Sequence, residues 1–519
     1  MPRLSLVALL LLALAGCRGD AGDGVEAPGP QAGVDVRLVE AEIVLDPATL
    51  ALDGTVALTL AHPPSLASLV LGLDDALEVA TVRVDGQGVL FVHEGDALSI
   101  PLFDPAVSVG DSASVVEVVY VGTPNAGLYA EDADGARVVF TDGWPDRTAG
   151  WLPMVHHPSD PARLDLTLDV PAAFEVVASG APVSDEVVGG RRRARFVLDG
   201  DAPVYTFAFA VGDFTVTEQA GIVPIRHALL AADAGLAGRL GRTPEILAAL
   251  AGMLGDYPYA SYATVQVPMV YAGMENATAA FLRADLYAET LPGRVPVEEV
   301  NVHEIVHQWW GNAVVPADWR DLWIAEGAAT FLTAALYDTL DGRDAGRAFL
   351  TLMSRSIGNA DADARLVPDG YADPADVLTP TVYQKGGSVF YLLSLALGED
   401  VFYPALRAVA ADYADRPLST EAFRASLEQT AGRDLGPIFD RWVWGEGRPT
   451  LRTRWDRDTR TLAWEIEDDG GSLAGLPFEL RIAQGDDVWF VPVTEGVFTP
   501  PGDDRPDVEP VGVLLKVRR

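Results

Sequence analysis

The periodicity of apolar residues changes twice along this chain, and each change marks a different kind of structure. Between residues 34 and 215, short runs that alternate apolar and polar residues are separated by Gly, Pro and Asp, as in VDVRLVEAEIVL. This pattern is typical of antiparallel β-strands. Longer helical repeats such as TPEILAALAGMLGDY occupy residues 216–447, and strand patterns such as DVWFVPV return in residues 448–519. We therefore expect a multidomain α+β protein with an N-terminal antiparallel β domain, a largely helical middle domain and a small C-terminal β sandwich.

The acidic charge of the chain argues against nucleic acid and anionic membrane surfaces as partners. The formal net charge is −38 at pH 7, whereas binding to nucleic acid or to an anionic membrane surface requires a basic patch. Apolar residues make up 49% of the sequence and charged residues 22%, which are values of an ordinary globular protein. We expect a soluble acidic surface and no nucleic-acid partner.

The first 17 residues, MPRLSLVALLLLALAGC, have the features of an export signal. One early arginine precedes an apolar run that is too short to span a bilayer. The ending Leu14-Ala15-Gly16-Cys17 resembles a bacterial lipobox, in which the cysteine is lipidated, and Cys17 is the only cysteine of the chain. Residues 18–33 are mostly Gly, Asp, Ala and Pro, which predicts a flexible tether. We expect an exported protein that is lipid-anchored to a bacterial membrane; a plain cleavage site beside a chance cysteine is the alternative.

The stretch HEIVHQWWGN places two histidines four residues apart, with a glutamate between them. On a helix His303 and His307 project from one face about one turn apart, so their imidazoles can take neighbouring positions around a zinc ion. Glu304 lies beside them and is placed to take a proton from a metal-activated water. A helix with two surface histidines is the alternative, but the pattern favours zinc.

A catalytic zinc site needs a third protein ligand and one open position. Glu326 follows His307 by nineteen residues, within the apolar stretch DLWIAEGAATF. A carboxylate in such surroundings is costly to bury unless it is paired or bound to a metal. We therefore predict one zinc ion per chain, held by His303, His307 and Glu326. Two histidines and one carboxylate on a single zinc indicate hydrolysis.

This ligand pattern resembles that of the gluzincin peptidases of the aminopeptidase N and leukotriene hydrolase family. Other stretches resemble the same family in the same order, and they run from the end of the N-terminal domain to the end of the middle domain. They are GWLPMVHHPSDPARLDLTLDVP (150–171), YAGMENATAAF (271–281), VYQKGGSVFYLL (382–393) and DLGPIFDRWVWGEGRPTL (434–451). The resemblance implies a thermolysin-like catalytic domain in residues 216–447.

The resemblance assigns the amine-binding role to the family's Gly-x-Met-Glu-Asn segment, here Ala272-Gly273-Met274-Glu275-Asn276, in which Ala272 stands where the motif usually has its first glycine. The glutamate of this segment holds the free α-ammonium of the substrate, which maps to Glu275. Such a carboxylate beside a zinc cleft restricts cleavage to the first residue of a peptide. Gly273 fits as a position where backbone must approach closely. We expect Gly273, Met274, Glu275 and Asn276 to bind substrate.

The resemblance also assigns a catalytic tyrosine, which maps to Tyr383. Its phenol would stabilise the negative charge that develops on the attacked carbonyl oxygen. Without the resemblance, a tyrosine in an apolar helix would be a core residue. Lys385, one of only two lysines in the chain, is expected to support local packing or charge rather than chemistry. Trp309, Trp310, Gly311 and Asn312 are expected to pack the zinc helix.

One departure concerns a segment that often reads Thr-Gln-x-Glu-Pro in the family. This chain has Thr141-Asp142-Gly143-Trp144-Pro145. Asp142 stands where the family's glutamine helps to bind the substrate's amino end, so it could face an ammonium or only cap a turn; we favour substrate binding. The pair His156-His157 suggests a second metal site, but a family-like loop explains it better. Asp321 could orient a zinc ligand.

We therefore predict a zinc aminopeptidase that acts on peptides with a free N-terminus. Two alternatives remain at this stage: an endopeptidase or other hydrolase on the same zinc scaffold, and a non-enzymatic binding lipoprotein. A second departure is the absence of a long helical stretch after Pro449, since the remaining residues have strand patterns. We expect a less enclosed cleft than in large family members unless a neighbouring subunit covers it.

Overall fold

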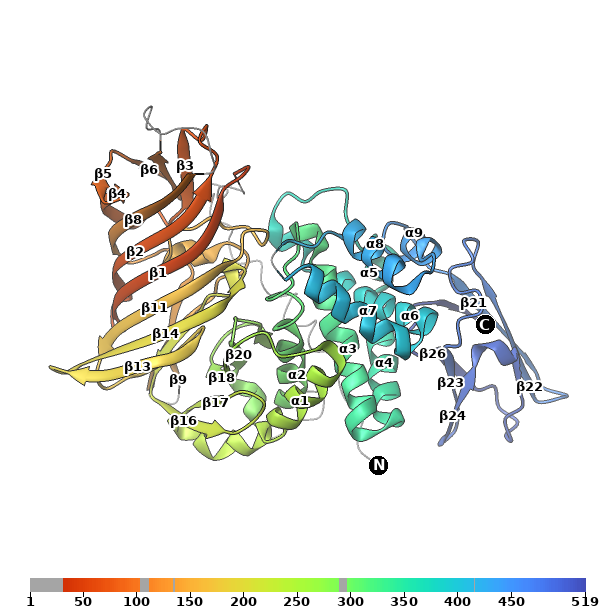
Figure 1. Cartoon of the computed structure of the whole chain (residues 1–519). Helices are drawn as coiled ribbons and strands as arrows, with labels where there is room; N and C mark the ends of the chain where they lie inside the picture. Colours follow the sequence, from red (N-terminus) through yellow and green to blue (C-terminus); the bar gives the residue numbers. More distant parts are fainter. Residues whose placement is uncertain (1–30, 103–111, 134–135, 289–295, 415) are drawn as a thin grey trace.

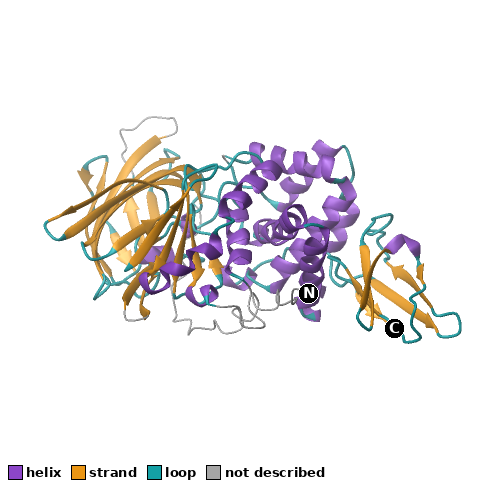
Figure 2. Ribbon diagram, turned by 90° about the horizontal axis from the view of Figure 1, so that it is seen from below, coloured by secondary structure: helices purple, strands orange, loops and turns teal. Residues whose placement is uncertain are grey.

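The computed structural model describes residues 31–102, 112–133, 136–288, 296–414 and 416–519, which form three bodies in a row (Figure 1). A strand-rich body at the N-terminal end is followed by a helical body and a smaller strand-rich body, and Figure 2 shows the helices gathered between the two strand-rich ends. Cys17, the expected signal and most of the expected tether lie outside the described residues. Within the described ranges, no helix has both the length and the apolar character needed to cross a membrane.

The largest sheet of the N-terminal domain has eight strands in the order β13-β14-β11-β1-β2-β8-β4-β5. Neighbouring strands are antiparallel, as expected, except for β1 and β11, which run parallel with Leu38 opposite Arg163. Buried and exposed residues alternate along these strands because one face covers a core. The strands are β1 (Asp35–Asp46), β2 (Ala51–His62), β4 (Leu77–Val84), β5 (Gln87–Gly88), β8 (Ser112–Gly122), β11 (Ala162–Pro171), β13 (Ala181–Val188) and β14 (Arg191–Ala202).

Two smaller sheets complete this domain. A four-stranded sheet has the order β12-β15-β10-β9, and a three-stranded sheet has the order β3-β7-β6. Apolar side chains of all three sheets form one core, which includes Leu58, Leu71 and Phe209. The strands are β3 (Ser68–Gly72), β6 (Val92–Glu94), β7 (Ala97–Pro101), β9 (Leu128–Ala133), β10 (Ala136–Thr141), β12 (Glu175–Ala178) and β15 (Phe209–Gly212).

The middle domain combines a five-stranded sheet of order β16-β17-β18-β20-β19 with a group of helices. Strand β16 already belongs to this sheet, so the domain begins at Phe214, two residues before the expected start. The strands are β16 (Phe214–Gln219), β17 (Ile225–Leu230), β18 (Tyr262–Val267), β19 (Gly273–Met274) and β20 (Ala279–Arg283). The helices are α1 (Thr243–Leu254), α2 (Val297–His307), α3 (Trp323–Asp341), α4 (Arg343–Ser356), α5 (Asn359–Asp363), α6 (Gly386–Leu397), α7 (Glu399–Asp412), α8 (Thr420–Ala431) and α9 (Gly436–Trp442).

The C-terminal domain consists of two small sheets, in agreement with the expected sandwich. Their orders are β25-β22-β21-β27 and β24-β23-β26. The strands are β21 (Thr450–Asp456), β22 (Thr461–Glu467), β23 (Glu479–Gln484), β24 (Asp487–Pro492), β25 (Val497–Phe498), β26 (Asp507–Pro510) and β27 (Lys516–Arg518).

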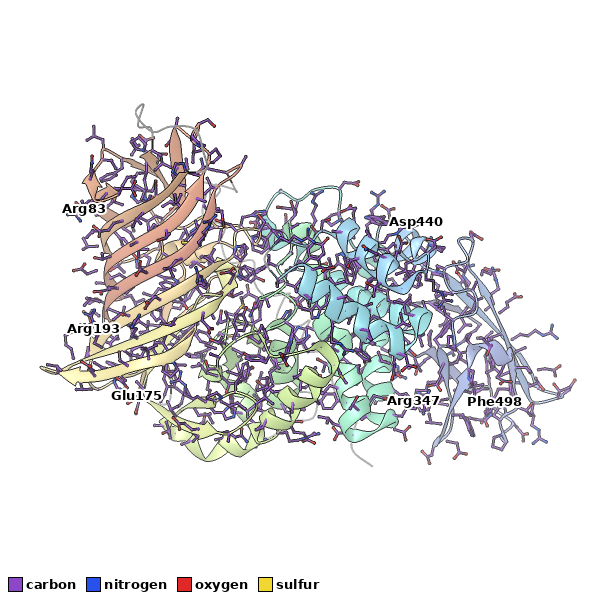
Figure 3. The ribbon with its side chains drawn as sticks, in the orientation of Figure 1. Arg83, Glu175, Arg193, Arg347, Asp440 and Phe498 are labelled. Atoms are coloured by element: carbon purple, nitrogen blue, oxygen red, sulfur yellow. The ribbon has the colours of Figure 1, made fainter. Side chains whose placement is uncertain are left out.

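The C-terminal sheets pack on the helices and share their apolar core. Phe478 and Val511 belong to the same buried cluster as Phe390 of α6. Arg347 of α4 lies at this boundary (Figure 3), where its Nη2 atom is 2.5 Å from Oε1 of Glu479 on β23. The two domains are therefore joined by a continuous core and a half-buried ion pair.

Candidate active site

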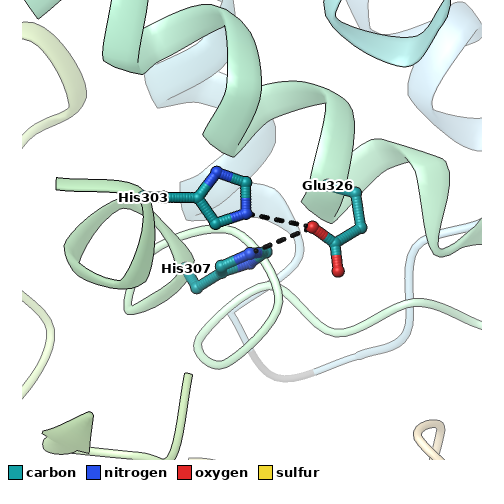
Figure 4. A group of neighbouring side chains, drawn as sticks. All are labelled: His303, His307 and Glu326. Atoms are coloured by element: carbon teal, nitrogen blue, oxygen red, sulfur yellow. Dashed lines mark hydrogen bonds and ion pairs between the residues drawn. The ribbon is translucent and has the colours of Figure 1, made fainter. Parts of the chain in front are cut away.

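His303, His307 and Glu326 lie together in the middle domain (Figure 4). The Oε2 atom of Glu326 is 3.2 Å from Nε2 of His303 and 3.3 Å from Nε2 of His307. All three side chains are buried, and one ligand atom from each lies within 4.8 Å of the others. The spacing of the sequence motif thus corresponds to a real cluster in space.

The donor set of this cluster fits zinc. The Nδ1 atom of His307 donates to the carbonyl oxygen of Trp310 at 3.0 Å, which leaves Nε2 free to bind a metal. Burial opposes ionisation of Glu326, but the two histidines hold its pKa down at about 2. Burial also opposes a charge on His307, yet the carboxylates around it, Glu326 first, raise its pKa to about 10. The site therefore favours a positive charge between these groups, which a zinc ion supplies.

Two helices bring the ligands together. Helix α2 carries both histidines on a segment that is buried from Val300 onward, and Glu326 lies in the first turn of α3. The side chain of Asp318 accepts from the backbone N–H of Arg320 and so fixes the turn that leads into α3. Each ligand is thus held by regular structure, which keeps the geometry of the site constant.

Glu304 is buried on α2 beside the two histidines. The segment that contains Gly273 leaves just enough room for the carboxylate of Glu304. A Cβ atom added to Gly273 would lie 2.0 Å from Oε1 of Glu304 and 2.7 Å from Cγ1 of Val300. Burial raises the pKa of Glu304 well above its ordinary value, which suits a group that accepts and returns a proton. Gly273 therefore gives room to the predicted general base; we had expected it to give room to the substrate.

Glu275 is buried beside this cluster, and the segment that follows helix α2 holds its backbone. The Nδ2 atom of Asn312 donates to the carbonyl oxygen of Glu275 at 2.7 Å, and Nε2 of Gln308 donates to the same oxygen at 3.3 Å. Gln308 also accepts from the backbone N–H of Thr278 through Oε1 at 2.8 Å. The position of Glu275 relative to the metal ligands is therefore set by two amide side chains.

The other two residues of this segment differ in their surroundings. Met274 is buried in an apolar cluster that joins the N-terminal and middle domains. Asn276 is also buried, but neither its Oδ1 nor its Nδ2 atom has a hydrogen-bond partner among the described residues. Buried amides rarely remain unpaired. Asn276 is thus the one of the two that has hydrogen-bonding capacity left for a ligand.

Tyr383 stands on a turn of π-helix (Thr381–Lys385) that leads into α6. Such turns often occur at functional sites. Its ring stacks against that of His303, with 6.1 Å between the centroids and 28° between the ring planes. Burial, followed by the nearby carboxylates, raises the pKa of Tyr383 well above its ordinary value, so the phenol remains a donor. The structure therefore places the predicted catalytic tyrosine at the zinc ligands.

The π-helical turn is fixed on both sides. Gly327 of α3 and Gly386 approach so closely that a Cβ on Gly327 would lie 2.7 Å from the carbonyl carbon of Gly386. Lys385 is fully buried, and its ammonium donates to the carbonyl oxygen of Ala364. Lys385 thus has the supporting role that we expected.

Asp142 is engaged within its own loop. Its Oδ2 atom is 2.5 Å from Nη2 of Arg147, and its Oδ1 atom accepts from the backbone N–H of Trp144 at 3.3 Å. The second contact is that of a residue capping a turn, the other role that the sequence allowed. The ion pair uses the charge that we had favoured for substrate binding, and we therefore leave Asp142 out of the amine site.

The remaining polar candidates have structural partners. His156 is buried against the carbonyl oxygen of Gly72, 3.2 Å from its Nε2 atom, and burial lowers its pKa to about 4. The pair His156-His157 is in neither group of possible metal ligands within the described residues. Asp321 accepts from the N–H and the hydroxyl of Thr420 at the start of α8 and not from a zinc ligand.

Sequence reasoning missed Gln308 and underestimated Asn312, which we had assigned to packing. Both follow the second histidine within QWWGN, a segment whose tryptophans predict burial. A polar side chain in a buried segment needs a partner. That rule indicates that Gln308 and Asn312 have hydrogen-bond partners. It does not identify the partner, which is the backbone carbonyl oxygen of Glu275.

Comparisons with known proteins agree with this site. Residues 241–442, from just before α1 to the end of α9, match the Peptidase family M1 domain. The sequence is 25% identical to aminopeptidase M1-B of Oryza sativa over 483 residues, which is 86% of this chain and 53% of that protein. It is 26% identical to human aminopeptidase B over 451 residues, 81% of this chain and 68% of that one. The chain thus spans about half the length of the rice relative.

The fold agrees as well. A crystal structure of an M1 zinc metallopeptidase mutant from Deinococcus radiodurans, bound to a Tyr-Ser-Ala substrate, superposes with a TM-score of 0.72 at 25% identity. The match covers 81% of this chain and 96% of the Deinococcus chain. The fold and the ligand set define a gluzincin-type zinc metallopeptidase. More narrowly, residues 241–442 and the overall fold are similar to those of M1 peptidases of the aminopeptidase N and leukotriene hydrolase type, as the motifs predicted.

Proposed function

We propose that this protein is a zinc-dependent aminopeptidase that removes N-terminal residues from peptides. The observation that carries the proposal is the position of Glu275, a buried carboxylate whose backbone is held by Gln308 and Asn312, two residues that closely follow the helix of the zinc-binding histidines. An anion that binds the free amine at a fixed distance from a hydrolytic metal places the first peptide bond of the substrate at that metal. The curated relatives with aminopeptidase names and the peptide-bound Deinococcus structure support it.

The chain's own residues divide the chemistry between them. His303, His307 and Glu326 would hold zinc, which when bound supplies a Lewis acid that polarises the scissile carbonyl and acidifies water. Glu304 takes a proton from the attacking water as the new C–O bond forms. It then gives that proton to the leaving nitrogen as the C–N bond breaks. The raised pKa of Glu304 suits both transfers.

Two further side chains act on the substrate itself. The phenol of Tyr383 donates a hydrogen bond to the carbonyl oxygen as negative charge develops on it. Glu275 pairs with the α-ammonium and so fixes the first residue in register. Because Glu275 and Tyr383 are held by different elements, the amine and the carbonyl are positioned independently.

A substrate panel tests this proposal. Aminoacyl fluorogenic substrates should be hydrolysed by the purified protein, whereas an internally quenched peptide with both ends blocked should not. A zinc chelator should abolish the activity and added zinc should restore it. Cleavage of the blocked peptide at a comparable rate would favour an endopeptidase on the same scaffold, and a lack of any zinc-dependent hydrolysis would favour the binding lipoprotein.

We further propose that the mature protein is anchored by lipid at Cys17 to the membrane of the bacterium that exports it. The signal-like segment before Cys17 and the Gly- and Pro-rich segment after it support this localisation. Replacing Cys17 with Ser should move the protein from the membrane fraction to the soluble fraction with unchanged kcat/KM. Retention of the Cys17→Ser variant on membranes after a salt wash would contradict the anchor.

A further inference from the structure

Tyr205 is a buried residue of the N-terminal domain, and it directly precedes Thr206, whose carbonyl oxygen binds the loop of Glu275. It lies on the short 3-10 turn η3 (Val204–Thr206) and is 1% exposed. Its ring packs edge-on against Trp144, with centroids 5.3 Å apart, and tilted against Trp319 at 5.4 Å. Its hydroxyl has no hydrogen-bond partner of good geometry among the described residues. A phenol in such a position is expected to use its donor in some way.

The backbone next to Tyr205 is attached to the loop that carries Glu275. The backbone N–H of Ala277 donates to the carbonyl oxygen of Thr206 at 2.9 Å. The backbone N–H of Gly180 donates to the side-chain oxygen of Thr278 at 2.7 Å. The N-terminal domain therefore holds this loop in addition to Gln308 and Asn312. These contacts bring η3 against that loop, and the hydroxyl of Tyr205 interacts with the carboxylate of Glu275.

Residues 141–145, which depart from the family pattern, supply no second carboxylate for the substrate's ammonium, and this makes the surroundings of Glu275 important. Trp144 stands where the pattern has a glutamate, and its ring is buried between Tyr205 and Trp319. Asp142 is occupied by Arg147. Neither position offers a free carboxylate, so Glu275 faces the substrate's ammonium without help from that segment. A single buried carboxylate needs a donor to stay ionised and to keep one orientation.

We propose that Tyr205 positions Glu275 for the α-ammonium of the substrate: its hydroxyl donates to one carboxylate oxygen and leaves the other for the ammonium. This inference rests on the proposed aminopeptidase function and adds a positioning residue that comes from the other domain.

Two inhibitors that differ only in the amine test the inference. L-leucine hydroxamate carries the α-amine, and 4-methylpentanohydroxamic acid lacks it; both can bind the metal. The ratio of their inhibition constants on one protein sample reports amine recognition and is independent of the folded fraction. Tyr205→Phe removes only the hydroxyl and keeps the ring packing. Tyr205→Phe should raise the inhibition constant of the amine-bearing inhibitor about five- to twentyfold and that of the other inhibitor less than twofold.

A matched control is available in Tyr287, another fully buried tyrosine, which packs in a different cluster with Leu240 and Leu286. Tyr287→Phe should leave the ratio unchanged. In the background of Glu275→Gln, Tyr205→Phe should change the ratio less than twofold, because the two residues act as one unit. Placing 4-aminophenylalanine at position 205 restores a donor on the same ring and should recover at least half of the lost discrimination.

The outcomes separate the inference from the function on which it rests. If the wild type prefers the amine-bearing inhibitor and Tyr205→Phe keeps that preference, the inference is overturned and the function stands. If Tyr205→Phe weakens both inhibitors equally, Tyr205 is only a packing residue and the inference is again overturned. If the wild type binds both inhibitors equally, the proposed function fails, and the role of Tyr205 fails with it.

Discussion

A Cβ atom on Gly273 would lie 2.0 Å from Oε1 of Glu304, so the predicted substrate-binding segment 273–276 and the predicted general base occupy adjoining space. Gly273→Ala must therefore displace the carboxylate of Glu304 or the strand β19 (Gly273–Met274). We predict a fall in kcat of at least about tenfold with zinc content unchanged, because the ligands are untouched. Steady-state kinetics together with metal analysis of the same sample measures both quantities.

Gly252 provides the control for this substitution. It lies in α1, and a Cβ there would meet no heavy atom within 4 Å. Gly252→Ala should leave kcat unchanged and stabilise the protein slightly, since alanine is the better helix former by about 1 kcal/mol. Normal turnover in Gly273→Ala would show that Glu304 does not need the position seen here.

The metal ligands and the base should respond differently to substitution. His303→Ala and Glu326→Ala should each lose both zinc and turnover, because two ligands hold the ion poorly. Glu304→Gln should retain about one zinc per chain and lose turnover by roughly a thousandfold or more, since only the base is removed. Metal analysis of the three variants after dialysis decides the matter. Loss of zinc in Glu304→Gln would assign that residue to the ligand set.

Asn312, whose amide binds the backbone of Glu275, should influence substrate binding without touching the substrate. Asn312→Ala removes the shorter of the two donors to the carbonyl oxygen of Glu275. We predict an increase of about three- to tenfold in KM for aminoacyl substrates and a loss of roughly 1–3 kcal/mol in the free energy of unfolding, as a buried carbonyl loses a partner. Substrate titrations and urea melts measure these effects. An unchanged KM would mean that Gln308 alone is sufficient.

A buried carboxylate in the N-terminal domain should make stability depend on pH. Asp160 accepts from the backbone N–H of Val36 at 3.1 Å, and burial raises its pKa from 3.8 to about 7. In the unfolded chain it ionises near pH 4, so its cost to folding appears as the pH rises above 4 and is complete above 7. The cost is on the order of 4 kcal/mol at most.

Asp160→Asn should remove that cost while keeping an acceptor for Val36. The melting temperature of the variant should therefore exceed that of the wild type at pH 8, and the two should converge at pH 4. Differential scanning calorimetry at both pH values checks this expectation. An equal difference at the two pH values would show that the carboxyl of Asp160 does not titrate as described.

The sequence predicted those parts of the site that short spacing determines. His303 and His307 are four residues apart on one helix, and the apolar flanks of Glu326 demanded a partner. It could not predict contacts between distant segments, such as the hydrogen bonds of Gln308 and Asn312 to the carbonyl oxygen of Glu275, because nothing local in the chain records them. The sequence left two roles open for Asp142, because a loop does not fix which side chains meet; its ion pair with Arg147, five residues away, became visible only in the structure.

The fold shows the same division. Alternation of apolar residues was enough to find β1, since one face of this strand is buried. The parallel pairing of β1 with β11 was not predictable, because the pattern within a strand carries no information about its neighbour. The C-terminal sheets were expected as a separate sandwich, and their shared core with the helices became visible only in three dimensions.

Cleavage of one peptide in two forms tests the central claim most directly. The peptide is offered with its amino end free and with the same end acetylated, to the wild type and to Glu275→Gln. The wild type should cleave the free form at its first bond and the acetylated form at least about a hundredfold more slowly. Glu275→Gln should lower kcat/KM on the free form about ten- to a hundredfold, which corresponds to a charged hydrogen bond of roughly 1.5–3 kcal/mol. Equal cleavage of both forms by the wild type would contradict the account.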